Sequence, residues 1–139
     1  MKHNSLPGIT AIRAVRCSDL LPNAMLRSIA GALIAIAAPS VTVSFHGIPA
    51  LTWEGTTVNG SRQEKATLRF DTTEPLPEGE RLAFVVTCAS GEQYLLGTRE
   101  PRFPVVEYSE TTGKPGGDPA VRSYTVTHTA QKSVLRCIL

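Results

Sequence analysis

Two apolar runs separated by a short Ser-Gly turn constrain the fold of this chain more than any other feature. Residues 82–88 and 93–97 are rich in aliphatic, aromatic and β-branched side chains, and Ser90 and Gly91 lie between them. Such runs around a small polar turn predict a tight β-hairpin. Both faces of the pair are largely apolar, which is typical of strands covered on two sides. We therefore expect this hairpin to form the centre of the core.

The register of this hairpin follows from the position of its turn. A two-residue turn centred on Ser90 and Gly91 opposes residues at equal distances from it. The predicted pairs are Cys88 with Gln93, Val86 with Leu95, Val85 with Leu96, and Phe84 with Gly97. In this register the aromatic ring of Phe84 would cover the bare backbone of Gly97.

The length and composition are those of one folded domain. A chain of 139 residues with 42% hydrophobic and 19% charged side chains is long enough for one core and short for two. We expect a single β-rich domain over residues 9–139. Residues 1–8 are polar and end in Pro-Gly, and we expect them to form a flexible N-terminal arm.

The charge of the chain gives no sign of a nucleic-acid partner. Fourteen basic and twelve acidic residues leave a formal net charge of +2. Nucleic-acid-binding domains normally carry a clustered basic face. Here the arginines are scattered along the sequence, so a solvated surface is the better interpretation and no nucleic acid is evident as a partner.

The three cysteines lie inside apolar runs. Cys17, Cys88 and Cys137 form no C-x-x-C pair, and free cysteine in such surroundings behaves as a small buried hydrophobe. We expect three reduced, buried thiols and hence synthesis inside the cell. One disulfide with a spare thiol is the alternative that the spacing leaves open.

One segment has the pattern of a helix. Apolar residues recur at helical spacing from residue 23 to residue 38, Asn23 can accept a first-turn N–H as N-cap, and Pro39 ends the run. From Met25 onward the same segment also resembles a secretion signal. We favour a short packed helix because 24 residues, including an apparent strand, precede Met25. The run is also shorter than the roughly 20 apolar residues that cross a bilayer, so we expect no membrane partner.

From residue 40 onward the apolar residues alternate, as in half-buried strands. Asn59 and Gly60 tolerate the positive φ of a type I′ turn and give the strongest short hairpin signal in the chain. This turn opposes Trp53 to Ala66 and Leu51 to Leu68. Residues 55–65 around it are polar, so we expect the tip to project beyond the core as a two-stranded arm.

The remaining strands complete a mainly β fold. Residues 9–17 predict a strand that Arg13 places at an edge, and residues 133–139 predict a paired C-terminal strand. Residues 111–119 have the composition of a flexible loop. The total of about eight strands and one short helix predicts a single-domain β-sandwich or barrel.

The chain contains no convincing catalytic or metal-binding pattern. His3, His46 and His128 have no second ligand at metal-site spacing, and no G-x-S-x-G turn occurs. The glycines of residues 113–117 lack the strand and the Lys-Ser/Thr pair of a phosphate loop. The candidate acidic pair for glycoside hydrolysis would come from Glu74, Glu78, Glu80 and Glu92, but no spacing singles out two of them. The aromatic residues that could stack on sugars are Trp53, Tyr94, Tyr108 and Tyr124.

From the residues alone we therefore assign no catalytic, cofactor-binding or metal-binding residue, and we expect a protein that is not an enzyme and needs no cofactor. The alternative is a secreted or surface β-sandwich that binds carbohydrate or a host protein.

Several landmarks occur together across residues 40–139. They are Leu51-Thr52-Trp53-Glu54, Ala66-Thr67-Leu68-Arg69-Phe70, residues 82–86, residues 94–100, Pro104, Gly113, Tyr124-Thr125-Val126-Thr127 and Lys132-Ser133-Val134-Leu135. This arrangement resembles small prophage structural proteins, of tail or head–tail type, from Bacteroides-like bacteria. The resemblance implies a virion building block that self-associates or binds other virion proteins through strand edges and projecting hairpins. It implies no catalytic residues, and a location first in the cytoplasm and then in the virion.

Overall fold

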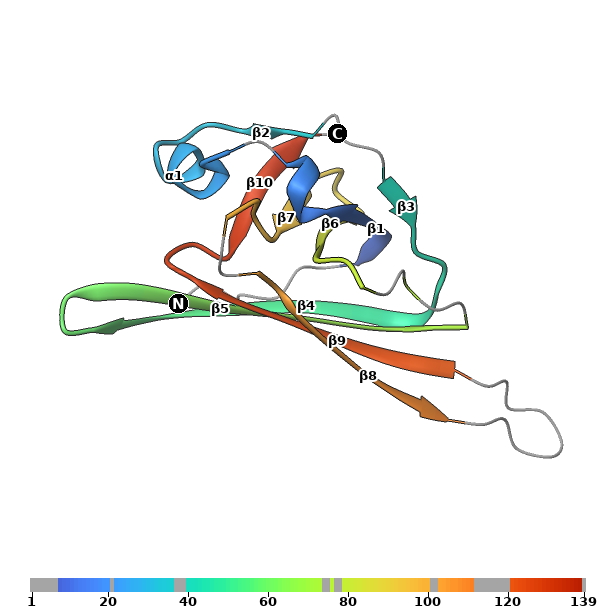
Figure 1. The fold of residues 1–139 in the computed structure, drawn as a ribbon. Helices are drawn as coiled ribbons and strands as arrows, with labels where there is room; N and C mark the ends of the chain where they lie inside the picture. Colours follow the sequence, from blue (N-terminus) through green and yellow to red (C-terminus); the bar gives the residue numbers. More distant parts are fainter. Residues whose placement is uncertain are drawn as a thin grey trace, which may run out of the picture.

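The computed structural model describes residues 8–20, 22–36, 40–73, 76, 79–100, 103–111 and 121–138. The predicted N-terminal arm, apart from Gly8, and the predicted loop over residues 111–119, apart from Thr111, lie outside these residues. Within the described part of the chain, ten strands form two sheets beside one short α-helix. The predicted mainly β, sandwich-like fold is confirmed (Figure 1).

The first sheet has six strands. They are β1 (Ile9–Arg16), β2 (Ile34–Ala35), β3 (Ser40–Thr42), β6 (Leu82–Cys88), β7 (Gln93–Leu96) and β10 (Val134–Ile138). Their order across the sheet is β2-β10-β7-β6-β1-β3. All neighbours are antiparallel except β2 and β10, which are parallel. The C-terminal strand is therefore paired, as predicted, and it has a neighbour on each side.

The second sheet has four strands, all antiparallel. They are β4 (Phe45–Val58), β5 (Ser61–Thr72), β8 (Val105–Thr111) and β9 (Val121–Ala130), in the order β4-β5-β9-β8. In Figure 1 this sheet forms a layer below the first one, and the hairpin of β4 and β5 extends past it at one end.

The hairpin of β4 and β5 has the predicted turn and register. Asn59 and Gly60 have φ values of +50° and +79°, as a type I′ turn requires. Trp53 pairs with Ala66 and Leu51 with Leu68. Because β9 pairs with β5 only from Glu64 onward, the ends of β4 and β5 nearest the turn pair only with each other, as the predicted arm requires.

The central hairpin, β6 and β7, is present, but its register differs by one residue from the prediction. The structure pairs Phe84 with Leu96, Val85 with Leu95, Val86 with Tyr94 and Thr87 with Gln93. The turn is longer than expected: the Gly91 N–H donates to the Cys88 carbonyl and the Cys88 N–H donates to the Glu92 carbonyl, both at 2.9 Å. Gly91 has a φ of +91°, typical of a three-residue loop closed by a glycine bulge.

The helix is shorter than predicted. α1 covers Ala24–Ile29 and follows a 3₁₀ turn, η1, at Cys17–Asp19. Gly31 has a φ of +95° and its N–H donates to the Ser28 carbonyl at 2.9 Å, which ends the helix. Of the apolar residues that follow, Ile34 and Ala35 pair with β10 as β2, and this pairing buries Ile34.

Asn23 is the N-cap residue of this helix, as predicted, but its side chain does not cap it. Asn23 has a φ of +58° and its side chain makes no capping hydrogen bond. Its backbone N–H instead donates to a carboxylate oxygen of Glu100 at 3.1 Å. The start of α1 is therefore tied to the connection after β7 rather than capped locally.

Strand β1 is one position in from the edge rather than at the edge itself. β3 covers it only from Arg13 to Val15. A register shift between Ile9 and Ala11 in its pairing with β6 changes which side chains point inward. Ile12 and Ala14 consequently face the other sheet.

The core consists of two apolar clusters on opposite faces of the six-stranded sheet. The cluster between the sheets contains Phe84 and Val86 of β6 together with Leu68 and Phe70 of β5. The cluster on the outer face contains Ala83 and Val85 of β6 with residues of η1, α1 and β2. Strand β6 is therefore buried on both faces, as its composition predicted.

Gly97 allows close contact between β6 and the connection that leads from β7 to β8. It has a φ of +126°, and a Cβ at this position would lie 2.7 Å from Ala83 Cβ and 3.0 Å from Pro104 Cγ. Phe84 does not oppose it, because the register is shifted by one residue. The close approach of Ala83, rather than an aromatic cover, is the reason for glycine here.

We expect Gly97→Ala to lower the free energy of unfolding by about 1–3 kcal/mol, because both the backbone angle and the space oppose a methyl group. Urea denaturation measures the change. Gly55→Ala is the matched control: the nearest atom to its added Cβ is at 3.7 Å, so its effect should stay within about 0.5 kcal/mol. Equal effects of the two substitutions would contradict this explanation.

Candidate functional site: the edges of the four-stranded sheet

The residues considered for chemistry from the sequence do not gather in one place. His128 is buried in β9 and only 1% exposed, His46 lies in β4, and His3 is outside the described residues. Within the described part of the chain, no group of three or more His, Cys, Asp or Glu residues could hold a metal ion.

The candidate carboxylates are also apart. Glu80 forms an ion pair with Arg16, whose Nε lies 3.2 Å from it. Glu92 accepts a hydrogen bond from the Tyr94 hydroxyl at 2.5 Å. Glu74 and Glu78 lie outside the described residues. Among the described carboxylates, these two are therefore engaged with different partners rather than with each other.

All three cysteines are free and buried. Burial raises the pKa of the Cys17 thiol to about 11, although Arg81 nearby lowers it. Burial likewise raises the pKa of Cys137 to about 12, against a lowering effect of Arg136. The pKa of Cys88 is raised by burial and by Glu92. Because the thiolate is the nucleophilic form, these are inert packing residues.

The aromatic residues pack mainly inside the sandwich. Tyr124 is 4% exposed and stacks on Phe70, with ring centroids 5.4 Å apart. Trp53 of β4 reaches across to Tyr94 of β7, with centroids 6.0 Å apart. Tyr108 on β8 is 54% exposed, and the Arg122 guanidinium lies 4.3 Å from its ring centroid. The described aromatic side chains thus form no open platform.

The two sheets differ in how their edges end. The edges of the six-stranded sheet are β2, with two residues, and β3, with three. Very short edge strands leave little backbone for another chain to pair with. The edges of the four-stranded sheet are β4, with 14 residues, and β8, with seven. Each of these long strands has a partner on one side only within the described residues.

Strand β4 is protected along one part of its length only. Its pairing with β5 is irregular between His46 and Ala50, where Pro49 removes a backbone donor and Ile48 is 95% exposed. Prolines and bulges hinder edge-to-edge pairing. From Ala50 to Val58 the pairing is regular and proline-free, so this stretch presents a continuous row of backbone donors and acceptors.

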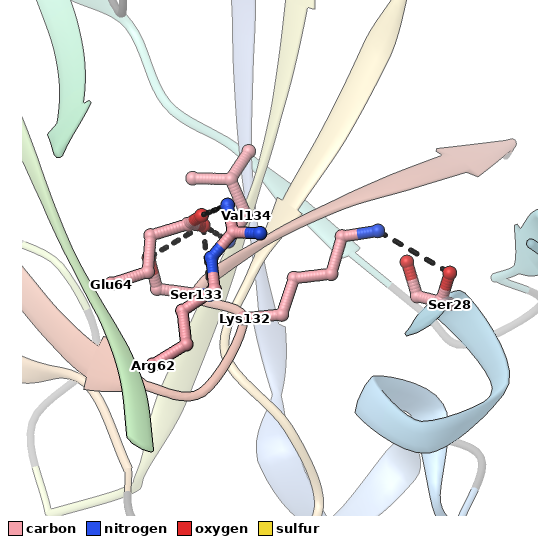
Figure 2. A network of polar contacts seen from close by, with 6 residues as sticks. All are labelled: Ser28, Arg62, Glu64, Lys132, Ser133 and Val134. Carbon is pink, nitrogen blue, oxygen red and sulfur yellow. Dashed lines mark hydrogen bonds and ion pairs between the residues drawn. The ribbon is translucent and has the colours of Figure 1, made fainter. Parts of the chain in front are cut away.

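A buried carboxylate fixes the projecting arm to the rest of the protein (Figure 2). Glu64 is 5% exposed and lies on β5 at the point where the arm begins. One of its oxygens accepts hydrogen bonds from the Ser133 N–H (3.0 Å), the Ser133 hydroxyl (3.1 Å) and the Val134 N–H (3.2 Å). Ser133 and Val134 lie where the chain passes from β9 into β10, so Glu64 connects the two sheets.

Neighbouring residues extend this network. The Arg62 guanidinium lies 3.5 Å from the other Glu64 oxygen and is largely exposed. Lys132 donates to the Ser28 carbonyl at 3.3 Å, near the end of α1. Figure 2 shows both side chains beside the Glu64 contacts. The root of the arm and the end of α1 thereby both contact the turn between β9 and β10.

The sequence contained a signal for Glu64 that the prediction missed. In β5 the inward positions are Glu64, Ala66, Leu68 and Phe70, so a charged residue occurs in phase with an apolar series. Buried charged groups require hydrogen-bond partners, but the partners, Ser133 and Val134, lie about 70 residues later in the chain, where β10 begins.

No protein-family model, no curated protein and no solved structure matches this chain. In the described part of the chain, none of the helices has the length and apolarity that crossing a bilayer requires.

We expect Glu64→Ala to lower the free energy of unfolding by about 3 kcal/mol, because two buried N–H groups lose a charged acceptor. Glu64→Gln keeps one acceptor oxygen and should cost about half as much. Glu54→Ala, at an exposed position of β4, is the control and should be nearly neutral. An effect of Glu64→Ala no larger than that of Glu54→Ala would contradict the anchor. Ser133→Ala removes only the hydroxyl contact and keeps both backbone donors, so it should cost less than Glu64→Ala.

Stability should fall at alkaline pH because of the buried thiols. Their pKa values in the folded protein, about 11 for Cys17 and about 12 for Cys137, exceed the ordinary thiol pKa of 9.0. The folded state therefore holds protons that the unfolded chain releases, and stability decreases as the pH rises from about 9 toward 11. Denaturant titrations at about pH 8 and about pH 10 measure the slope.

The control for this pH dependence is the double variant Cys17→Ala, Cys137→Ala. Tyr94, whose pKa burial and Glu92 raise to about 12, contributes with the same sign in both proteins. The difference in slope between them therefore isolates the thiols, and identical slopes would contradict the prediction.

Proposed function

We propose that this chain is a non-enzymatic virion structural protein of phage origin that acts by self-association, as a tail or head–tail component. The observation that carries the proposal is the contrast between the two sheets. One sheet ends in strands of two and three residues, whereas the other ends in strands of 14 and seven residues. Long open edges invite another chain to add a strand.

The strand directions support a head-to-tail arrangement of copies. β4 and β8 lie at opposite edges of one all-antiparallel sheet and run antiparallel to each other. When a second copy is placed beside the first in the same orientation, its β8 edge meets β4 in antiparallel pairing. Such a heterologous contact closes into a ring if the rotation per copy allows it.

Charge favours this arrangement over pairing of two identical edges. β8 carries Glu107 and Glu110, both exposed; Glu110 forms an ion pair with Arg122, whereas Glu107 lies opposite Thr125. A two-fold contact between two β8 strands would bring the Glu107 carboxylates of both copies into one interface. Like charges on neighbouring strands are destabilising. In the regular stretch of β4 the one acidic residue, Glu54, has Lys65 as its cross-strand neighbour, so β4 is the better partner for β8.

The sequence resemblance to prophage structural proteins supports the same proposal and motivates the virion location, with synthesis in the cytoplasm. The carbohydrate-binding alternative has less support. Sugar sites need exposed aromatic faces, and of the described aromatic residues only Tyr108 is more than half exposed, beside the Arg122 guanidinium.

We expect the protein to form assemblies larger than a dimer, with a mass that rises with concentration until a ring closes. Light scattering coupled to size exclusion measures the mass, and negative-stain electron microscopy identifies rings or tubes. A strict monomer at every concentration up to the solubility limit would overturn the proposal.

Variants locate the interface. Thr52→Lys on β4 and Val105→Lys on β8 place a charge on exposed edge positions and should each weaken association at least about tenfold. Thr125→Lys puts the same charge on the inner strand β9 and should leave association unchanged. Equal weakening by all three variants would argue against the strand edges as the contact.

A further inference from the structure

Three arginines that are far apart in the sequence line one pocket. Arg16, Arg81 and Arg99 line a cavity of about 580 Å³, and the other described residues of its lining are Cys17, Ser18, Gly79, Glu80 and Phe103. The cavity lies at the end of β1 and the beginning of β6. It is therefore separate from the edges of the four-stranded sheet.

Two of these arginines are held in place by contacts within the protein. The Arg81 guanidinium lies over the Phe103 ring, 4.4 Å from its centroid, and the Arg81 carbonyl accepts the Cys17 N–H at 2.9 Å. The Nε of Arg16 lies 3.2 Å from a Glu80 oxygen. Stacking on an aromatic ring leaves the N–H groups at the edge of a guanidinium free to bind an anion.

The pocket has an excess of positive charge. Among the described residues of its lining, three guanidinium groups are opposed by one carboxylate, Glu80, and that carboxylate is the partner of Arg16. Within the described residues, no carboxylate forms an ion pair with Arg81 or Arg99. The lining thus carries two positive charges more than negative ones, and the Ser18 hydroxyl adds a neutral donor.

We infer that this pocket binds a dianionic oxyanion, of the chemical class of phosphate or a phosphate monoester. A phosphate group carries about −1.5 to −2 charges at neutral pH, which matches the excess charge of the lining. The planar guanidinium fork binds phosphate oxygens bidentately. Arg81, stacked on Phe103, is the pre-organised group, and Arg16 and Arg99 approach from the other segments. This site is independent of the proposed self-association.

The test is a titration of the full chain with inorganic phosphate, followed by amide NMR shifts, at constant ionic strength maintained with chloride. We expect saturable shifts at Ser18, Arg81 and Phe103. A parallel titration with O-phosphoserine distinguishes a free phosphate from a phosphate ester. The compound with the lower Kd identifies which of the two classes the pocket binds. Shifts that chloride alone reproduces, or that do not saturate, would overturn the inference.

Variants connect the binding to the arginines. Arg99→Ala and Arg81→Ala should each weaken phosphate binding about tenfold, as expected for one lost charge-assisted contact. Arg99→Lys keeps the charge without the fork and should give a smaller loss. The control is Arg27→Ala, which removes an exposed arginine on α1 that does not line the pocket. An equal loss of phosphate affinity in this variant would mean that net charge alone, and not the pocket, accounts for the binding.

Discussion

The structure depends on the burial of β6 on both of its faces. Phe84 and Val86 pack against the four-stranded sheet, while Ala83 and Val85 pack against the segment that contains η1, α1 and β2. Burying an aliphatic or aromatic side chain contributes about 1.5–3 kcal/mol relative to leaving it exposed. A strand with apolar residues on both faces gains this on each face only if a layer covers it. The second sheet and the short helical segment are those two layers.

The four-stranded sheet plays a different part, because it uses one face for the core and leaves its long edges without a second partner among the described residues. Its hairpin arm extends past the sandwich (Figure 1). The Glu64 contacts to Ser133 and Val134 anchor the root of this arm, so the arm is a rigid extension at its base. The six-stranded sheet, in contrast, ends in very short strands at both sides. The six-stranded sheet thus ends in short edge strands, whereas the four-stranded sheet ends in long ones.

The candidate sites were harder to predict than the fold. The long open edges follow from the order of strands, and no local pattern reports which strand lies at an edge. In the sequence, the three arginines of the pocket looked like scattered surface charges. Arg16, Arg81 and Arg99 line one pocket because β1 pairs with β6 and the chain returns to the same corner after β7. Glu64 was visible as an anomaly in an alternating strand, but its partners are about 70 residues away in the sequence.

The sequence by itself determined the mainly β class, the burial of β6 on both faces and the register of the long hairpin. These properties are local, since alternation of side chains and the positive φ of Asn59 and Gly60 need no distant partner. Tertiary structure decided the rest. Pairing with β10 took Ile34 and Ala35 out of the predicted helix. The one-residue shift of the central register is instead local, because the loop closed by Gly91 has three residues rather than two. Contacts between distant segments outweigh local preferences of less than about 1 kcal/mol per residue, so the edges, the Glu64 anchor and the arginine pocket exist only in the folded chain.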